Sequence, residues 1–121
     1  MHTLNFYIRF ATAVRSGKKS SSIRSKRLKV GHPYRLVTGQ HTKQCEQLGI
    51  GTITSVSEVV LAWREIGGYP VIKVDGVVLS ERSMEQLAAD EGFMDLGDMI
   101  DFFGEHYKLP FNGFLNRWVA K

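Results

Sequence analysis

The sequence predicts an α+β fold, a small mixed or antiparallel β-barrel with a short N-terminal helix and a helical pair before the last strand. First, the segments that are typical of strands follow one another instead of alternating with helices, which disfavours a doubly wound sheet. Second, Asp75 and Gly76 separate two apolar segments, and this dipeptide is a strong hairpin signal. Third, the apolar residues recur with a helical period from Ser80 onward.

Five or six strands are expected, each with a short apolar or β-branched segment as its signal. Segment 50–63 is rich in β-branched residues, so it predicts a long strand that is bent or bulged. Residues 40–49 are polar and predict a loop or a short helix. The expected strands cover 4–8, 20–25, 34–39, 50–63 and 111–119, and the hairpin lies within 69–80.

Three helices are expected from apolar residues at helical spacing. The first covers 9–17 and ends at Gly17. The second begins with Ser80 or Ser83 as its N-cap and stops at Gly92. The third begins near Asp95, where acidic residues suit the helix dipole, and carries an apolar stripe that we assign to the core: Leu96, Met99, Ile100, Phe103 and Tyr107.

Length and composition indicate a single domain over 1–121, with 43% hydrophobic and 23% charged residues. The sequence contains neither an apolar run long enough for a membrane span nor the pattern of a secretory signal, so no membrane partner is expected. The lone Cys45 cannot form an internal disulfide and suits a reducing cytosol, which predicts a cytoplasmic protein.

The charge is distributed unevenly along the chain. Residues 46–121 carry six cations and all twelve acids, whereas residues 1–45 carry ten cations and no acid. A basic half attracts phosphates, which favours a nucleic-acid surface. The alternative is that the two halves neutralise each other within one fold. The ten cations are Arg9, Arg15, Lys18, Lys19, Arg24, Lys26, Arg27, Lys29, Arg35 and Lys43.

The sequence offers little for a metal or a cofactor. The four histidines are scattered, and only His41 and Cys45 stand four residues apart, which is too few ligands for a zinc site. Dinucleotide-binding, P-loop and esterase signatures are absent. We therefore expect neither a metal nor a cofactor.

Lys19 and Ser22 form a candidate catalytic pair. A serine hydroxyl needs a base to become nucleophilic, and a lysine can serve if neighbouring cations lower its pKa. Asp90 or Glu91, at the end of the second expected helix, can supply an orienting carboxylate. Residues 19 and 22 face opposite ways on a regular strand, so Lys19 has to precede the strand or lie at a bulge. The alternative is that the serines are surface strand positions and the lysines are solvated.

The order of several blocks resembles the ASCH domain family from Leu4 to Trp118: "RFATAVRSGKKSSSIR", "VGHPYRLVTG", "TITSV", "LAADEGFMDLGDMIDFF" and "LPFNGFLNRW". A further block, "TGQHTKQCEQLG", is similar to one found in a bacterial and phage subset of the family. The resemblance implies a barrel of the PUA-like superfamily, whose relatives mostly bind RNA or modified bases.

The family also implies site residues. One bacterial member is an amidohydrolase that deacetylates acetylcytidine with a lysine, a threonine and a glutamate, and another is reported as a ribonuclease. By position these residues fall on Lys19, Ser22 and Glu91, with Asp90 competing for the carboxylate, and the arginine of the Ile-Arg block falls on Arg24. Serine replaces threonine here, and segments 39–49 and 64–75 are longer, so the substrate does not transfer.

The sequence and the family resemblance therefore favour two functions. The first is binding of RNA or a modified nucleoside through a basic cleft, with contacts from Lys18, Arg24, Lys26, Arg27 and Lys29. The second is an amidohydrolase with Lys19, Ser22 and Glu91 as its catalytic set. A ribonuclease ranks lower because its usual histidine pair is not evident. An acidic protein partner for the basic face is a third alternative.

Overall fold

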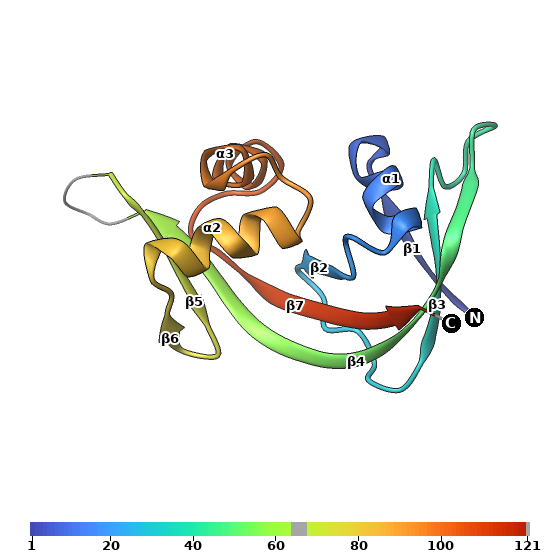
Figure 1. Ribbon diagram of the computed structural model, residues 1–121, viewed down its shortest axis with the longest axis horizontal. Helices are drawn as coiled ribbons and strands as arrows, with labels where there is room; N and C mark the ends of the chain where they lie inside the picture. Colours follow the sequence, from blue (N-terminus) through green and yellow to red (C-terminus); the bar gives the residue numbers. More distant parts are fainter. Residues whose placement is uncertain (64–67, 121) are drawn as a thin grey trace.

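The computed structural model describes residues 1–63 and 68–120. Within them the chain forms a seven-stranded sheet and three helices, in an order that confirms the predicted α+β class (Figure 1). The predicted hairpin lies within the described residues, whereas part of the long segment 64–75 lies outside them. The elements are β1 (His2–Phe6), α1 (Ile8–Ser16), β2 (Ser21–Arg24), β3 (Pro33–Thr38), β4 (Glu46–Trp63), β5 (Pro70–Val74), β6 (Val77–Val78), α2 (Glu81–Asp90), α3 (Leu96–His106) and β7 (Phe111–Ala120).

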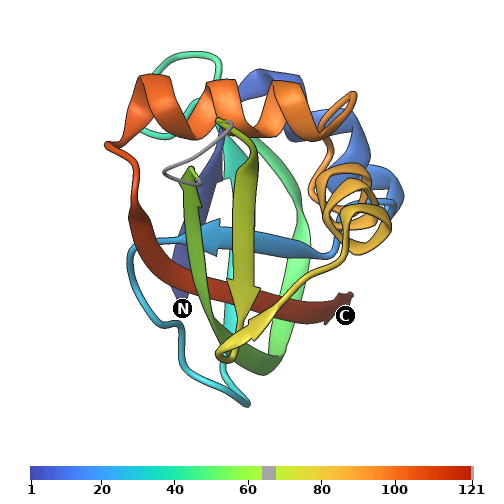
Figure 2. The same cartoon turned by 90° about the vertical axis from the view of Figure 1, so that its left-hand side faces the viewer.

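The sheet is mixed and strongly curved, and its strands do not close into a complete barrel. Its main path runs β1-β3-β4-β5-β6, and β7 pairs with both β4 and β2. Strands β1 and β3 are parallel, while the other pairs are antiparallel. Figure 2 shows β2 and β7 running across the direction of β5 and β1. The predicted barrel is thus an approximation, because β1 and β6 remain as sheet edges.

Strand β4 is the longest element, with 18 residues, and it spans the molecule. Its pairings with β3 and β7 contain register shifts, as expected for a bent strand. The predicted loop at 40–49 is wrong in its last residues, because β4 begins at Glu46. Thr38 pairs with Glu46 and Val37 with Gln47, so this polar segment joins the sheet through backbone hydrogen bonds. Its polar side chains do not predict this pairing.

The helix ends follow local signals. Gly17 caps α1 with a φ of 83°, in the left-handed region that glycine adopts without strain. Ser80, rather than Ser83, is the N-cap of α2, and Asp95 caps α3 by accepting a hydrogen bond from the backbone of Asp98. The predicted apolar stripe of the third helix is wrong at its last position. The helix ends at His106, and the next residue, Tyr107, is 39% exposed.

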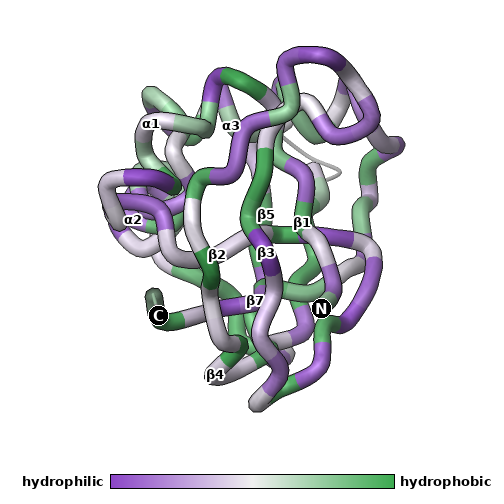
Figure 3. Tube along the Cα trace, turned by 90° about the vertical axis from the view of Figure 1, so that its right-hand side faces the viewer, coloured by the Kyte–Doolittle hydropathy of each residue, from purple (hydrophilic) through white to green (hydrophobic). Residues whose placement is uncertain are grey.

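The core lies between the helices and the concave side of the curved β4–β7 pair (Figure 1). Leu61, Ile72, Met99 and Leu115 are almost completely buried in it. Strand β3 lies beside β1 (Figure 3), and along it Arg35 is exposed between the buried residues Tyr34 and Leu36. No helix among the described residues is long and apolar enough to cross a membrane.

Candidate functional site

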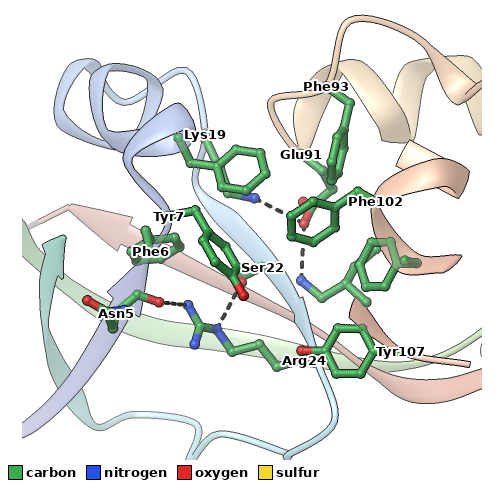
Figure 4. Close-up of a pocket in the computed structure, with 13 residues that line it drawn as sticks. Asn5, Phe6, Tyr7, Lys19, Ser22, Arg24, Glu91, Phe93, Phe102 and Tyr107 are labelled. Atoms are coloured by element: carbon green, nitrogen blue, oxygen red, sulfur yellow. Dashed lines mark hydrogen bonds and ion pairs between the residues drawn. The ribbon is translucent and has the colours of Figure 1, made fainter. Parts of the chain in front are cut away.

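A pocket opens between the start of the chain and the α2–α3 region (Figure 4). It holds about 470 Å³ of empty space, including its open mouth. A cavity of this size suits one small ring better than an oligonucleotide. The lining residues are Asn5, Phe6, Tyr7, Phe10, Lys19, Ser22, Ile23, Arg24, Glu91, Phe93, Phe102, Phe103 and Tyr107.

Aromatic rings make up most of the pocket wall. Phe10 from α1 contacts Phe93 and Phe102 edge-on, with ring centroids 5.3 and 5.6 Å apart. Phe102 and Phe103 follow each other in α3 and both line the pocket, where Phe102 is partly exposed and Phe103 is only 2% exposed. Tyr7 and Phe102 also meet edge-on, at 5.6 Å. The wall therefore joins rings from two separate parts of the chain.

A buried ion pair joins these two parts inside the pocket. The Lys19 Nζ lies 3.2 Å from the Glu91 Oε1, and the two residues are 4% and 1% exposed. Lys19 precedes β2, and its backbone N–H donates to the carbonyl of Ala13 at the end of α1. Glu91 follows α2, where the chain turns through Gly92 with a φ of 90°. A Cβ on Gly92 would lie 3.1 Å from the Phe10 ring, so glycine also permits the close approach of the two segments.

Three donors surround the Glu91 carboxylate. Oε1 accepts from Lys19 and, at 3.1 Å, from the backbone N–H of Ile23 on the open edge of β2. Oε2 accepts from the Ser21 hydroxyl. Burial lowers the pKa of Lys19 below its usual value, although the charge and hydrogen bond of Glu91 oppose this shift, and the positive charge of Arg24 lowers the pKa further.

Arg24 forms the second polar group of the pocket. Its Nε donates to the Ser22 Oγ at 3.0 Å, and its Nη2 donates to the carbonyl of Asn5 at 2.7 Å. The guanidinium lies over the Phe6 ring, 4.9 Å from its centroid. Burial lowers the pKa of Arg24 from its usual value, while Tyr107 and Glu91 raise it. These contacts fix the orientation of the guanidinium.

The structure brings together four of the predicted site residues: Lys19, Ser22, Arg24 and Glu91 all line the pocket. Within the described residues, Lys19 and Ser22 share no hydrogen bond, and the hydroxyl that contacts Glu91 belongs to Ser21. Asp90, the competing carboxylate, is exposed and accepts a hydrogen bond from Gln86. The carboxylate in the pocket is thus that of Glu91.

The other predicted binding residues lie outside this pocket. They are exposed on the surface: Lys18, Lys26, Arg27 and Lys29. Lys18 faces a depression that contains Asp90, whereas Lys26 lines a groove beside the pocket mouth. Arg27 lies over the Phe114 ring, 5.3 Å from its centroid. The exposed cations are thus spread over more than one face.

Part of the basic charge of the first 45 residues is neutralised within the fold. Three cations of the first 45 residues pair with acids of the second half: Arg9 with Asp98, Arg15 with Glu46, and Lys19 with Glu91. Among the residues that the structure describes, the remaining cations of this half have no acidic partner within 4.0 Å. The molecule therefore keeps a net positive surface after partial neutralisation.

The aromatic wall was not anticipated from the sequence. The helical period assigns Phe103 and Tyr107 to a core stripe, and it gives no sign that these two residues and Phe102 line a pocket. No group of three or more potential metal ligands occurs in the described residues. His41 lies in the exposed loop after β3, and Cys45 is exposed.

The fold is similar to that of a solved structure, a serine-to-alanine mutant of the ZmASCH protein from Zymomonas mobilis. The TM-score is 0.51 at 12% sequence identity, and the match covers 98% of this chain and 66% of that one. The chain thus spans slightly less than two thirds of that protein. No family model and no curated protein matches the sequence. The α+β fold of the chain is thus similar to that of an ASCH protein, which confirms the resemblance at the level of fold.

Proposed function

We propose that the protein binds a modified nucleoside, either free or within an RNA strand, by enclosing its base in the aromatic pocket. The single observation that carries this proposal is a ring-sized pocket walled by aromatic side chains and containing buried polar groups. Aromatic faces stack on any base, whereas a few fixed polar groups give specificity. Lys19 and Arg24 offer donors to base oxygens, and Glu91 offers an acceptor to an amino group.

The surface charge supports the same proposal. A net charge of +4 with unpaired cations on the surface favours ligands that carry phosphates. We further propose a cytoplasmic location, which the single free cysteine suits.

Calorimetric titration with acetylcytidine, and with a short single-stranded RNA that contains it, tests the proposal. We expect saturable binding of both, with the RNA affinity falling as salt rises. Tyr7→Ala removes an exposed ring from the pocket mouth and is expected to weaken binding about tenfold, because one stacked ring contributes about 1–3 kcal/mol. Tyr69→Ala, which removes an exposed tyrosine that does not line the pocket, is the matched control. Failure of both ligands to bind at low salt contradicts the proposal.

A second candidate function is hydrolysis of an amide on such a base. The observation that favours it is the buried Lys19 beside Glu91, with a pKa lowered toward the range where an amine can accept a proton. In this reaction a water or the Ser22 hydroxyl adds to the amide carbonyl, the C–N bond breaks, and the released amine takes up a proton. If Ser22 attacks, a water then hydrolyses the acyl-serine ester and restores the hydroxyl. Overall, water is consumed and a carboxylate and an amine are formed.

Because no hydrogen bond joins Lys19 and Ser22 in the described residues, substrate or water has to complete the contact. Mass spectrometry of acetylcytidine after incubation with the protein tests this function. The adjacent serines provide a matched pair of variants: Ser22→Ala is expected to abolish deacetylation if its hydroxyl attacks, whereas Ser21→Ala is expected to retain part of the rate. Unchanged acetylcytidine with the wild-type protein excludes the reaction and leaves binding as the function.

A further inference from the structure

A second depression continues from the mouth of the nucleoside pocket. Arg24 and Tyr107 line both cavities, so the two are contiguous at this point. We call this depression the side groove; it is lined by His2, Thr3, Leu4, Arg24, Ser25, Lys26, Leu28, Tyr34 and Tyr107. Two of these side chains are permanent cations at neutral pH, and none of the lining residues is acidic. The side groove therefore favours an anion.

Arg24 is held in an orientation that leaves donors for a ligand. Its Nε and Nη2 are engaged by Ser22 and Asn5, and the third nitrogen, Nη1, has no hydrogen bond among the described residues (Figure 4). A guanidinium presents a planar fork of N–H groups that matches phosphate oxygens. Because its other donors and its stacking on Phe6 already fix it, little side-chain entropy remains to be lost when Nη1 binds an anion.

The loop that carries Lys26 is also fixed in place. Asn116 of β7 is completely buried, and its Oδ1 accepts from the backbone N–H of Leu28 at 3.0 Å. Its Nδ2 lies 3.3 Å from the carbonyl oxygen of Lys26 and 3.4 Å from that of Ser22. One buried amide of β7 thus holds both the loop after β2 and, through the Ser22 carbonyl, β2 itself, which lines the pocket. The position of Lys26 relative to Arg24 is therefore set by the core.

We propose that the side groove is a phosphate subsite, in which Arg24 and Lys26 bind the phosphate of the nucleotide whose base occupies the pocket. This inference rests on the proposed function and restricts its range of ligands, because a nucleotide or an RNA residue is then preferred over a free nucleoside. The distinction matters because a neutral nucleoside leaves the side groove empty.

Calorimetric titration at low salt with four probes tests the subsite: acetylcytidine, its 5′-monophosphate, its 3′-monophosphate and inorganic phosphate. One of the two monophosphates is expected to bind about tenfold more tightly than the nucleoside, because a charge-assisted hydrogen bond contributes about 1.5–3 kcal/mol. Inorganic phosphate alone is expected to bind weakly, since it lacks the stacking of the base.

Lys26→Ala is expected to remove most of the affinity that the monophosphate gains over acetylcytidine in the same variant. Lys29→Ala is the matched control, because Lys29 is an exposed cation in the same loop that does not line the side groove. It corrects for the general loss of one positive charge. Arg24→Lys keeps the charge but loses the fork, and it is expected to reduce the gain as well.

The possible results are distinct. Equal affinities for the nucleoside and both monophosphates overturn the phosphate subsite and leave the proposed function standing. Equal losses of the phosphate gain in Lys26→Ala and Lys29→Ala also overturn it, because they show general electrostatic attraction. If neither the nucleoside nor any monophosphate binds, the proposed function and the subsite both fail. Tight binding of inorganic phosphate without a contribution from the base overturns the link to a nucleotide.

Discussion

The Lys19–Glu91 pair should show strong energetic coupling, and a double-mutant cycle measures it. Lys19→Met leaves the Glu91 carboxylate buried with its hydroxyl and backbone donors but without a counter-charge. Breaking a buried ion pair in this way costs about 3–5 kcal/mol, and the two remaining donors place the expected cost near the lower limit. Glu91→Gln keeps the shape of the side chain, but its amide nitrogen cannot accept a hydrogen bond and the Lys19 ammonium loses its counter-charge, with an expected cost of about 2–3 kcal/mol.

The double variant contains no buried charge, so it should lose much less than the sum of the single losses. We expect a coupling free energy of at least about 2 kcal/mol from urea denaturation at neutral pH. The exposed Arg15–Glu46 pair, with side chains 46% and 56% exposed, is the matched control, and its cycle should give less than about 1 kcal/mol. Additive losses at Lys19 and Glu91 would refute the reasoning that the two charges compensate each other in a buried site.

The pH dependence of the same variants gives an independent check. Because burial lowers the pKa of Lys19 from its usual value of 10.5, the unfolded chain binds more protons than the folded one between the two pKa values. The wild-type protein should therefore gain stability relative to Lys19→Met as the pH rises toward 10.5. A stability difference that stays constant or falls over this window would contradict the lowered pKa.

Three further changes have clear expected outcomes. Hydrogen bonds from the Met94 backbone N–H and from Arg9 lower the pKa of Asp98, so Asp98→Asn should reduce the free energy of unfolding by less than about 1 kcal/mol at neutral pH. Acid denaturation should show that this loss disappears as the pH falls below the usual pKa of 3.8. Gly113→Ala should cost about 2 kcal/mol or more in thermal unfolding, because the added Cβ would lie 2.5 Å from the backbone oxygen at position 24. Asn116→Ala should reduce the free energy of unfolding by about 2–3 kcal/mol and accelerate amide hydrogen exchange in loop 25–29. Unchanged exchange would show that the loop holds its position without the buried amide.

The fold could be predicted where the signal is local. Gly17, Ser80 and Asp95 end or begin helices through their own backbone or side-chain geometry, and the turn at Asp75-Gly76 uses two positive φ values, 50° and 79°. The parallel pairing of β1 with β3 and the open edges of the sheet depend on contacts between distant segments. No local pattern in the sequence encodes that pairing, so the barrel was predicted as more closed than it is.

The site could be predicted only where its residues are close in sequence or follow the family blocks. Lys19, Ser22 and Arg24 are neighbours in sequence, and their relation to Glu91 followed from the order of the family blocks. The choice between Asp90 and Glu91 required the actual turn after α2, which buries one carboxylate and exposes the other. The role of Ser21 was missed, because the direction of a hydroxyl at the start of a short strand depends on what packs against that strand.

The pairing of β2 with β7 also affects how the protein is made. Ser22 and Asn116 are 94 positions apart, yet they pair in neighbouring strands, so β2 cannot take its native place in the sheet until β7 has been synthesised. Closing so long a loop is entropically costly and slow compared with forming the helices, which makes the pocket a late product of folding. A ligand present during synthesis would then bind only chains that have completed this step and would draw the folding equilibrium toward them.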